Sequence, residues 1–129
     1  MLREQSGFRP HHSTQTALIY VTDHILRGIN DGYVTGAIFV DLKKAFDTVD
    51  HRILLEKLNH AGVKGHELQW FRSYLEERVQ VTKIDDRMSS FAPVTIGVPQ
   101  GSILGPLMFV IYINSLPLAF TDLECKVHM

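Results

Sequence analysis

Residues 37–51 read AIFVDLKKAFDTVDH, in which a short apolar run is followed by three aspartates. The run from Ala37 to Val40 consists of apolar residues that favour strands, and it predicts a buried β-strand. Asp41 stands at the end of this strand. There a carboxylate can be held rigidly with its oxygens facing a cleft, which suits a hard cation such as Mg²⁺. The spacing is equally compatible with a structural role, in which Asp41 pairs with Lys43 or Lys44 or caps the next helix.

Three helices are predicted around this segment, one before it and two after it. Ser13 is a suitable N-cap for the first, which runs to about Gly28. Asp50 caps the second, which ends near Gly62, and the third follows Gly65. The apolar residues at helical spacing are Leu18, Val21, Ile25 and Ile29 in the first helix, Ile53, Leu54, Leu55 and Leu58 in the second, and Leu68, Phe71 and Leu75 in the third.

The hydrophobic period changes from helical to alternating near residue 79. Residues 79–84 and 91–98 predict the two strands of a hairpin, with the turn at residues 85–88. Pro93 restricts the second strand to an edge or a bulge, because proline cannot donate a backbone hydrogen bond. An apolar helix is then predicted for residues 106–116.

Residues 97–106 read GVPQGSILGP and form the second candidate functional segment, after the aspartate-containing one. Its glycines and prolines specify the backbone closely, and Gly101 would let a ligand approach the main chain because it has no Cβ. Gln100 offers both a donor and an acceptor. A purely structural loop between an edge strand and a helix fits the composition equally well.

The order of predicted elements is helix, strand, two helices, hairpin and helix, and Cys125 to Met129 resembles the start of another strand. This mixture predicts α+β layers with an antiparallel component rather than a regular βαβ winding. The length of 129 residues is at most one domain's worth of chain. A single cysteine excludes a disulfide framework and a zinc site built from several thiolates.

The charge and hydropathy of the chain limit its partners. Thirteen Lys and Arg against fourteen Asp and Glu give a net charge of −1, without the positive excess of a self-sufficient nucleic-acid binder. The longest apolar run, residues 103–113, is too short to cross a bilayer, so no membrane association is expected. The first residues lack the apolar core of a signal peptide. The sequence therefore predicts an intracellular protein, with nucleus and cytoplasm both open.

Three segments together resemble the reverse transcriptase domain of non-LTR retrotransposons, of the LINE type that includes jockey-like and CR1-like elements. The resemblance covers nearly the whole chain. It implies a partial right-hand polymerase palm at residues 36–129, with an antiparallel sheet packed on helices, and a remnant of the fingers at residues 1–35. The matching segments are Gln5 to Pro10 with Ser13-Thr14 for the fingers motif, Phe39 to His51 for motif A, and Gly97 to Pro106 with Phe109 to Leu116 for motif B.

The resemblance also implies roles for individual residues. Asp41 would be the catalytic carboxylate that binds two Mg²⁺ or Mn²⁺ ions, which stabilise the attacking and leaving oxygens of an in-line displacement. Phe46 would lie under the incoming sugar and exclude a 2′-hydroxyl by steric overlap. Gln100 and Gly101 would line the nucleotide and template pocket, and Arg9 would reach the triphosphate or the template strand.

One feature of the family is not found within residues 1–129. Motif C, a Tyr-Ala-Asp-Asp hairpin with the other metal-binding carboxylates, would be expected just after Met129. Hard-cation sites need several converging oxygens, so we expect these residues alone to bind no metal stably and to be inactive. Asp122 and Glu124 are the nearest acids, but neither stands in the family's motif. An exposed palm edge would also favour self-association.

The parent activity implied by the resemblance is RNA-directed DNA synthesis, with an RNA template, a DNA primer and deoxynucleotides as partners. The sequence leaves a second interpretation open, in which the chain is a catalytically dead or domesticated relic that binds nucleic acid or a protein. A third interpretation, an unrelated α+β hydrolase using Asp41 or Asp47, requires the motif matches to be accidental.

Overall fold

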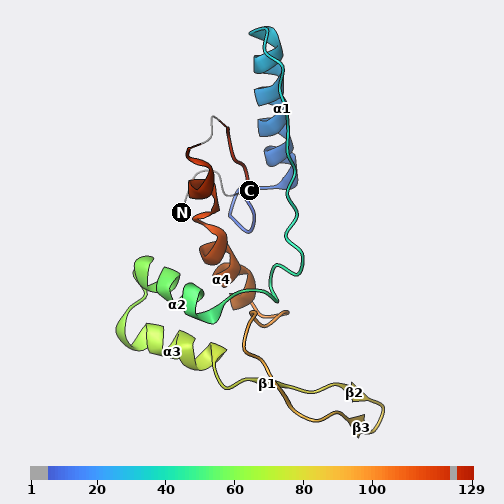
Figure 1. Cartoon of the computed structure of the whole chain (residues 1–129), viewed down its shortest axis with the longest axis vertical. Helices are drawn as coiled ribbons and strands as arrows, with labels where there is room; N and C mark the ends of the chain where they lie inside the picture. Colours follow the sequence, from blue (N-terminus) through green and yellow to red (C-terminus); the bar gives the residue numbers. More distant parts are fainter. Residues whose placement is uncertain (1–5, 123–124) are drawn as a thin grey trace. The chain divides into compact units, whose positions relative to one another are not determined.

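The computed structural model describes residues 6–122 and 125–129, so the expectations for Gln5 and Glu124 lie outside the described residues. The chain divides into two compact units (Figure 1). One unit contains residues 1–43 and 114–129, and the other contains residues 44–113. No helix among the described residues is long and apolar enough to cross a membrane.

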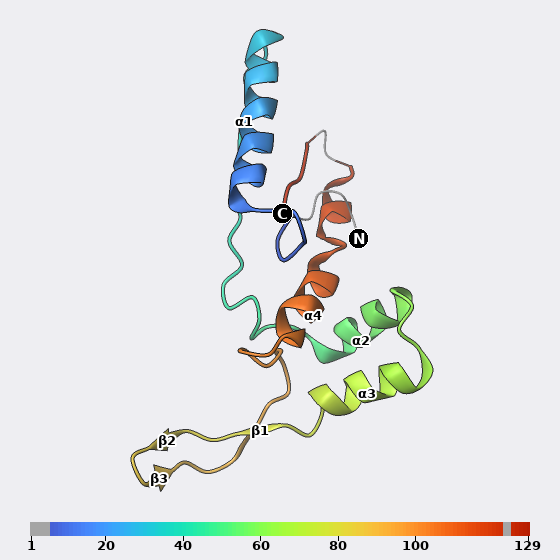
Figure 2. The same ribbon diagram turned by 180° about the vertical axis from the view of Figure 1, so that it is seen from behind.

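Helix α1, Thr14–Asn30, is the main element of the first unit (Figures 1 and 2). Ser13 is its N-cap, as the sequence predicts. The Ser13 hydroxyl accepts the N–H of Thr16 at 3.2 Å, and the Thr16 hydroxyl accepts the N–H of Ser13 at 2.9 Å, which completes a capping box. None of the helix residues is buried within the described structure. A short 3-10 helix, Leu116–Phe120, also belongs to this unit and has Pro117 in its first turn.

Two strand predictions in the first unit are wrong. Residues 37–40 form no strand, and their side chains are exposed rather than buried. Residues 125–129 are also irregular, and the carbonyl of Met129 accepts the N–H of Ser6 at 2.6 Å. The physical reason is the same for both segments. A strand exists only beside a hydrogen-bonded neighbour. Among the described residues neither segment belongs to a sheet, and the one bond from Ser6 to Met129 does not make a ladder.

Three helices form the core of the second unit. They are α2, His51–His60, α3, Gly65–Leu75, and α4, Leu104–Ile113. Helix α2 packs against both of the others, and the two views agree on this arrangement (Figures 1 and 2). The helices predicted after Asp50 and Gly65 are confirmed, whereas α4 ends three residues before the predicted Leu116. The buried core consists of Val49, Leu54, Leu55, Leu58, Leu75, Val98, Met108 and Phe109.

The predicted hairpin is present between α3 and α4. Strand β1, Val79–Gln80, pairs antiparallel with β4, Ala92–Pro93, and β2, Lys83–Ile84, pairs antiparallel with β3, Arg87–Met88. Every strand residue is exposed, and the hairpin extends away from the three helices (Figures 1 and 2). The described residues thus contain helices and small antiparallel sheets, as expected of an α+β chain. They do not contain the expected sheet packed on helices, because each strand pairs over only two residues.

Candidate functional site

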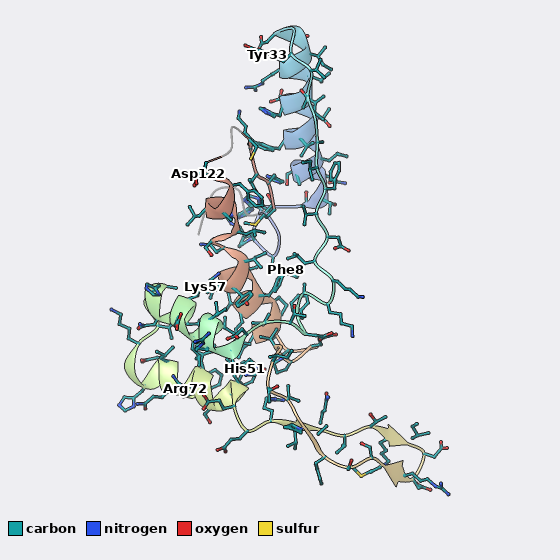
Figure 3. The ribbon with its side chains drawn as sticks, in the orientation of Figure 1. Phe8, Tyr33, His51, Lys57, Arg72 and Asp122 are labelled. Carbon is teal, nitrogen blue, oxygen red and sulfur yellow. The ribbon has the colours of Figure 1, made fainter. Side chains whose placement is uncertain are left out.

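Two distant segments of the second unit are joined by their backbones, and this junction forms the candidate site. The N–H of Gly97 donates to the carbonyl of Val49 at 2.8 Å, and the N–H of Val98 donates to the carbonyl of Phe46 at 2.9 Å. His51, labelled in Figure 3, donates from Nε2 to the Gly97 carbonyl at 2.7 Å. The nitrogen must be the donor, because a carbonyl only accepts. The end of the motif A segment and the start of the motif B loop are therefore held together.

Gly97 is required at this junction for two reasons. Its φ is +88°, a conformation that side chains disfavour. A Cβ at Gly97 would lie 2.9 Å from the carbonyl oxygen of Asp47, closer than ordinary contact allows. The backbones of the two segments can approach this closely only because residue 97 has no side chain.

Asp47 and Gln100 interact across the same junction. The Nε2 of Gln100 donates to Oδ1 of Asp47 at 2.6 Å, although the two residues are 53 positions apart in the sequence. Both residues are exposed. The sequence pattern points to Gln100 but not to its partner, since no pattern of residue types connects positions so far apart. The only available signal is that Asp47 directly follows Phe46 in motif A.

Phe46 is held by the core of the second unit. Its ring packs on the ring of Phe109 in α4, with centroids 4.7 Å apart and planes inclined by 37°. Phe46 is half-buried, so one part of the ring is fixed by packing while the rest remains accessible to solvent. A ring held in place in this way can exclude a ligand that is too large by steric overlap.

The loop that carries Gln100 and Gly101 is fixed by its own hydrogen bonds. The hydroxyl of Ser102 donates to the carbonyl of Pro99 at 2.9 Å and accepts the N–H of Gly105 at 3.0 Å. Gly101 has a φ of +80°, and no atom lies within 4 Å of the place where its Cβ would be. No side chain or backbone atom therefore covers the main chain at Gly101, and its role in ligand binding stays a prediction.

A cavity of about 620 Å³ opens beside this loop. Its wall combines the loop with the base of the hairpin, including Arg78. Asp47 and Gln100 both line it. The guanidinium of Arg78 lies 5.4 Å from the centre of the Tyr74 ring and donates to the Tyr74 carbonyl at 3.4 Å.

The other two predicted site residues belong to the first unit. Asp41 is exposed and has no hydrogen bond or ion pair among the described residues. Arg9 is half-buried, and its carbonyl accepts the N–H of His12 at 3.3 Å. The structure thus brings Phe46, Gln100 and Gly101 into one unit, and it places Asp41 and Arg9 in the other.

The donor set for a metal ion is incomplete in the described part of the chain. Residues 6–122 and 125–129 contain no group of three His, Cys, Asp or Glu side chains that could hold a metal ion. A pair of Mg²⁺ or Mn²⁺ ions needs several oxygen ligands converging on each ion. These residues by themselves therefore do not fit a two-cation site.

The chain is similar to a known protein family and to several known polymerases. The model of the family described as reverse transcriptase (RNA-dependent DNA polymerase) matches residues 1–129. The chain is 35% identical over 119 residues to the probable RNA-directed DNA polymerase from transposon BS of Drosophila melanogaster. It is 38% identical over 114 residues to the RNA-directed DNA polymerase from mobile element jockey, and 34% identical over 113 residues to the probable polymerase from transposon X-element, both of the same fly. Each alignment covers 88% of this chain but only 12% of the relative's length.

Proposed function

The chain belongs to the reverse transcriptase family, the RNA-dependent DNA polymerases, and we propose from this membership that it forms part of the catalytic domain of a polymerase that copies RNA into DNA. Its similarity to jockey and the X-element identifies the family branch as that of non-LTR retrotransposons. The observation that carries the proposal is the backbone junction between Phe46 to Val49 and Gly97 to Val98. It brings together motif A and motif B, the two segments that the family would use to form one nucleotide-binding site.

The proposal extends to the architecture and the partners of the polymerase. Residues 36–129 contribute to the palm and residues 1–35 to the fingers. The partners are an RNA template, a DNA primer and a deoxynucleotide. Self-association through an exposed edge of the palm is part of the same proposal.

The roles proposed for Phe46, Gln100 and Gly101 rest on their surroundings, and that of Arg9 rests on its charge. Phe46 excludes a 2′-hydroxyl by steric overlap. Its ring packs against Phe109, which limits how far the ring can move away from a bound sugar. Gln100 and Gly101 line the nucleotide and template pocket, because one borders an open cavity and the other leaves the main chain bare. Arg9 contacts the triphosphate or the template strand as a fixed positive charge.

Reverse transcriptases use Mg²⁺ or Mn²⁺. We assign one carboxylate of such a site to Asp41. Asp41 alone does not make such a site, and the described residues contain no group of three His, Cys, Asp or Glu side chains that could hold a metal ion. Residues 1–129 alone are therefore expected to add no nucleotides to a primer.

The direct test is primer extension on an RNA template by the full-length natural protein that contains these residues, with Mg²⁺ or Mn²⁺ present. Asp41→Asn should lower the rate at least about a hundredfold, because a neutral amide is a much weaker ligand for a hard cation. Asp31→Asn is the matched control, since Asp31 is an exposed aspartate of the same unit and caps α1 through its backbone.

Two results would contradict the proposal. Extension that persists unchanged in Asp41→Asn would remove Asp41 from the catalytic site. A wild-type protein that binds RNA but adds no nucleotide would favour the relic that binds without catalysis.

A further inference from the structure

The interaction between Asp47 and Gln100 suggests a role for a residue that has none in the proposed site. We infer that Asp47 is a positioning residue, whose carboxylate holds the amide of Gln100 in one orientation toward the bound nucleotide or template. The inference rests on the proposed function, because it concerns what Gln100 presents to that ligand.

The chemistry of the pair fixes the orientation of the amide. A carboxylate only accepts hydrogen bonds, so it selects the Nε2 side of Gln100 and not the Oε1 side. The two atoms lie 2.6 Å apart, within hydrogen-bond distance, and the acceptor carries a charge, which strengthens such a bond. With Nε2 on Asp47, the Oε1 atom and the second N–H of Gln100 remain available for a ligand. A free glutamine could rotate its amide and present either end.

The backbone that carries the Asp47 carboxylate is held in place by hydrogen bonds. The backbone on each side of Asp47 is bound to the motif B loop, through Phe46 on one side and Val49 on the other. The N–H of Asp47 also donates to the carbonyl of Lys44 at 2.9 Å. A side chain as short as aspartate has few rotamers, so this anchoring limits where its oxygens can lie.

The other end of the pair is equally constrained. Gln100 stands between Pro99 and Gly101, within the turn that Ser102 closes through Pro99 and Gly105. Both residues of the pair line the cavity of about 620 Å³ at the base of the hairpin. Gln100 therefore borders space that a ligand can enter.

The kinetic test uses single-nucleotide incorporation on an RNA template by the full-length natural protein. Asp47→Ala should raise KM for the deoxynucleotide by about threefold to tenfold, the range for one misplaced neutral hydrogen bond. The kcat should change by less than about twofold, since no reacting group is removed. Asp47→Asn keeps an oxygen acceptor at the same place and should lie closer to wild type than Asp47→Ala.

A double-mutant cycle separates positioning from any independent role of Asp47. In a Gln100→Ala background, adding Asp47→Ala should have no further effect on KM, because the residue to be oriented is already absent. Effects that simply add would overturn the inference. Asp86→Ala is the matched control, since Asp86 is an exposed aspartate of the same unit in the hairpin turn. An Asp47→Ala variant that behaves like Asp86→Ala would also overturn it.

A second measurement needs no activity. Hydrogen exchange of the peptide that contains residues 100–105 should be about twofold to fivefold faster in Asp47→Ala than in Asp86→Ala, because one exposed tether of the loop is lost. Equal exchange in the two variants would show that Asp47 does not hold the loop. If the wild-type protein adds no nucleotides, the proposed function fails, and the exchange measurement alone decides whether Asp47 holds the Gln100 loop.

Discussion

At the scale of single residues, the site depends on one position that has no side chain. Gly97 combines a positive φ with a close approach to the backbone of Asp47. These two constraints can be separated, because other glycines of the chain carry one of them or neither. Gly62 has a φ of +100° but open space around it, whereas Gly36 has open space and no positive φ.

Gly97→Ala should therefore be the most costly of three alanine substitutions. It should lower the free energy of unfolding by about 3 kcal/mol, from backbone strain and overlap together. Gly62→Ala should cost about 1 kcal/mol from strain alone, and Gly36→Ala should be nearly neutral. Thermal unfolding of the three variants measures the order. Equal losses in Gly97→Ala and Gly62→Ala would mean that the contact with Asp47 is not close in solution.

At the scale of elements, side-chain caps explain where α1 and α2 begin. The carboxylate of Asp50 accepts the N–H of Ile53 at 3.0 Å and so satisfies one free donor at the start of α2. This hydrogen bond lowers the pKa of Asp50 below its ordinary value of 3.8, even though desolvation acts in the opposite direction. The charged form of Asp50 is therefore the one that stabilises the folded chain.

The lowered pKa of Asp50 predicts how this stabilisation depends on pH. Its contribution is complete above the pKa of the unfolded state and is lost as the pH falls through the lower pKa of the folded state. Asp50→Asn should retain the helix, because asparagine is also a good N-cap, but should abolish this part of the acid dependence. The comparison is between acid unfolding curves of Asp50→Asn and of the exposed Asp86→Asn. Curves of identical shape would show that Asp50 does not contribute.

At the scale of the whole molecule, the described chain exposes a run of large apolar side chains around residues 34–40. The segment predicted as a strand contains Ile38 and Phe39, whose side chains are 92% and 89% exposed. Val34 and Val40, on either side of them, are 100% and 74% exposed. A run of apolar residues with unpaired backbone is a ready site for pairing with another chain.

We therefore expect the 129-residue chain to associate in solution in a concentration-dependent manner. Phe39→Ser should shift the population toward monomer, because it removes a large apolar side chain from this segment. Phe91→Ser is the matched control, since Phe91 is 73% exposed on the hairpin. Sedimentation velocity over a range of concentrations measures both. A monodisperse wild-type monomer with a cooperative melt would contradict the expectation.

The sequence by itself determined the features that depend on neighbouring residues. The Ser13 and Asp50 caps, the helices that they begin and the hairpin all follow from short-range spacing, because helix and turn chemistry acts within a few residues. The order of motifs A and B was sufficient to identify the family, which the comparison confirmed. The strand expected at residues 37–40 failed because a strand needs a partner that local pattern cannot supply.

Only the tertiary structure decided what meets at the site. The hydrogen bond from Gln100 to Asp47 spans 53 positions, and the contact between Gly97 and Asp47 spans a similar separation, so neither leaves a local signal. Both depend on how α2 and α4 pack around the buried core, because the two segments lead directly into these helices. Local propensity selects the elements of this protein, whereas the shape of its core selects which of their side chains touch.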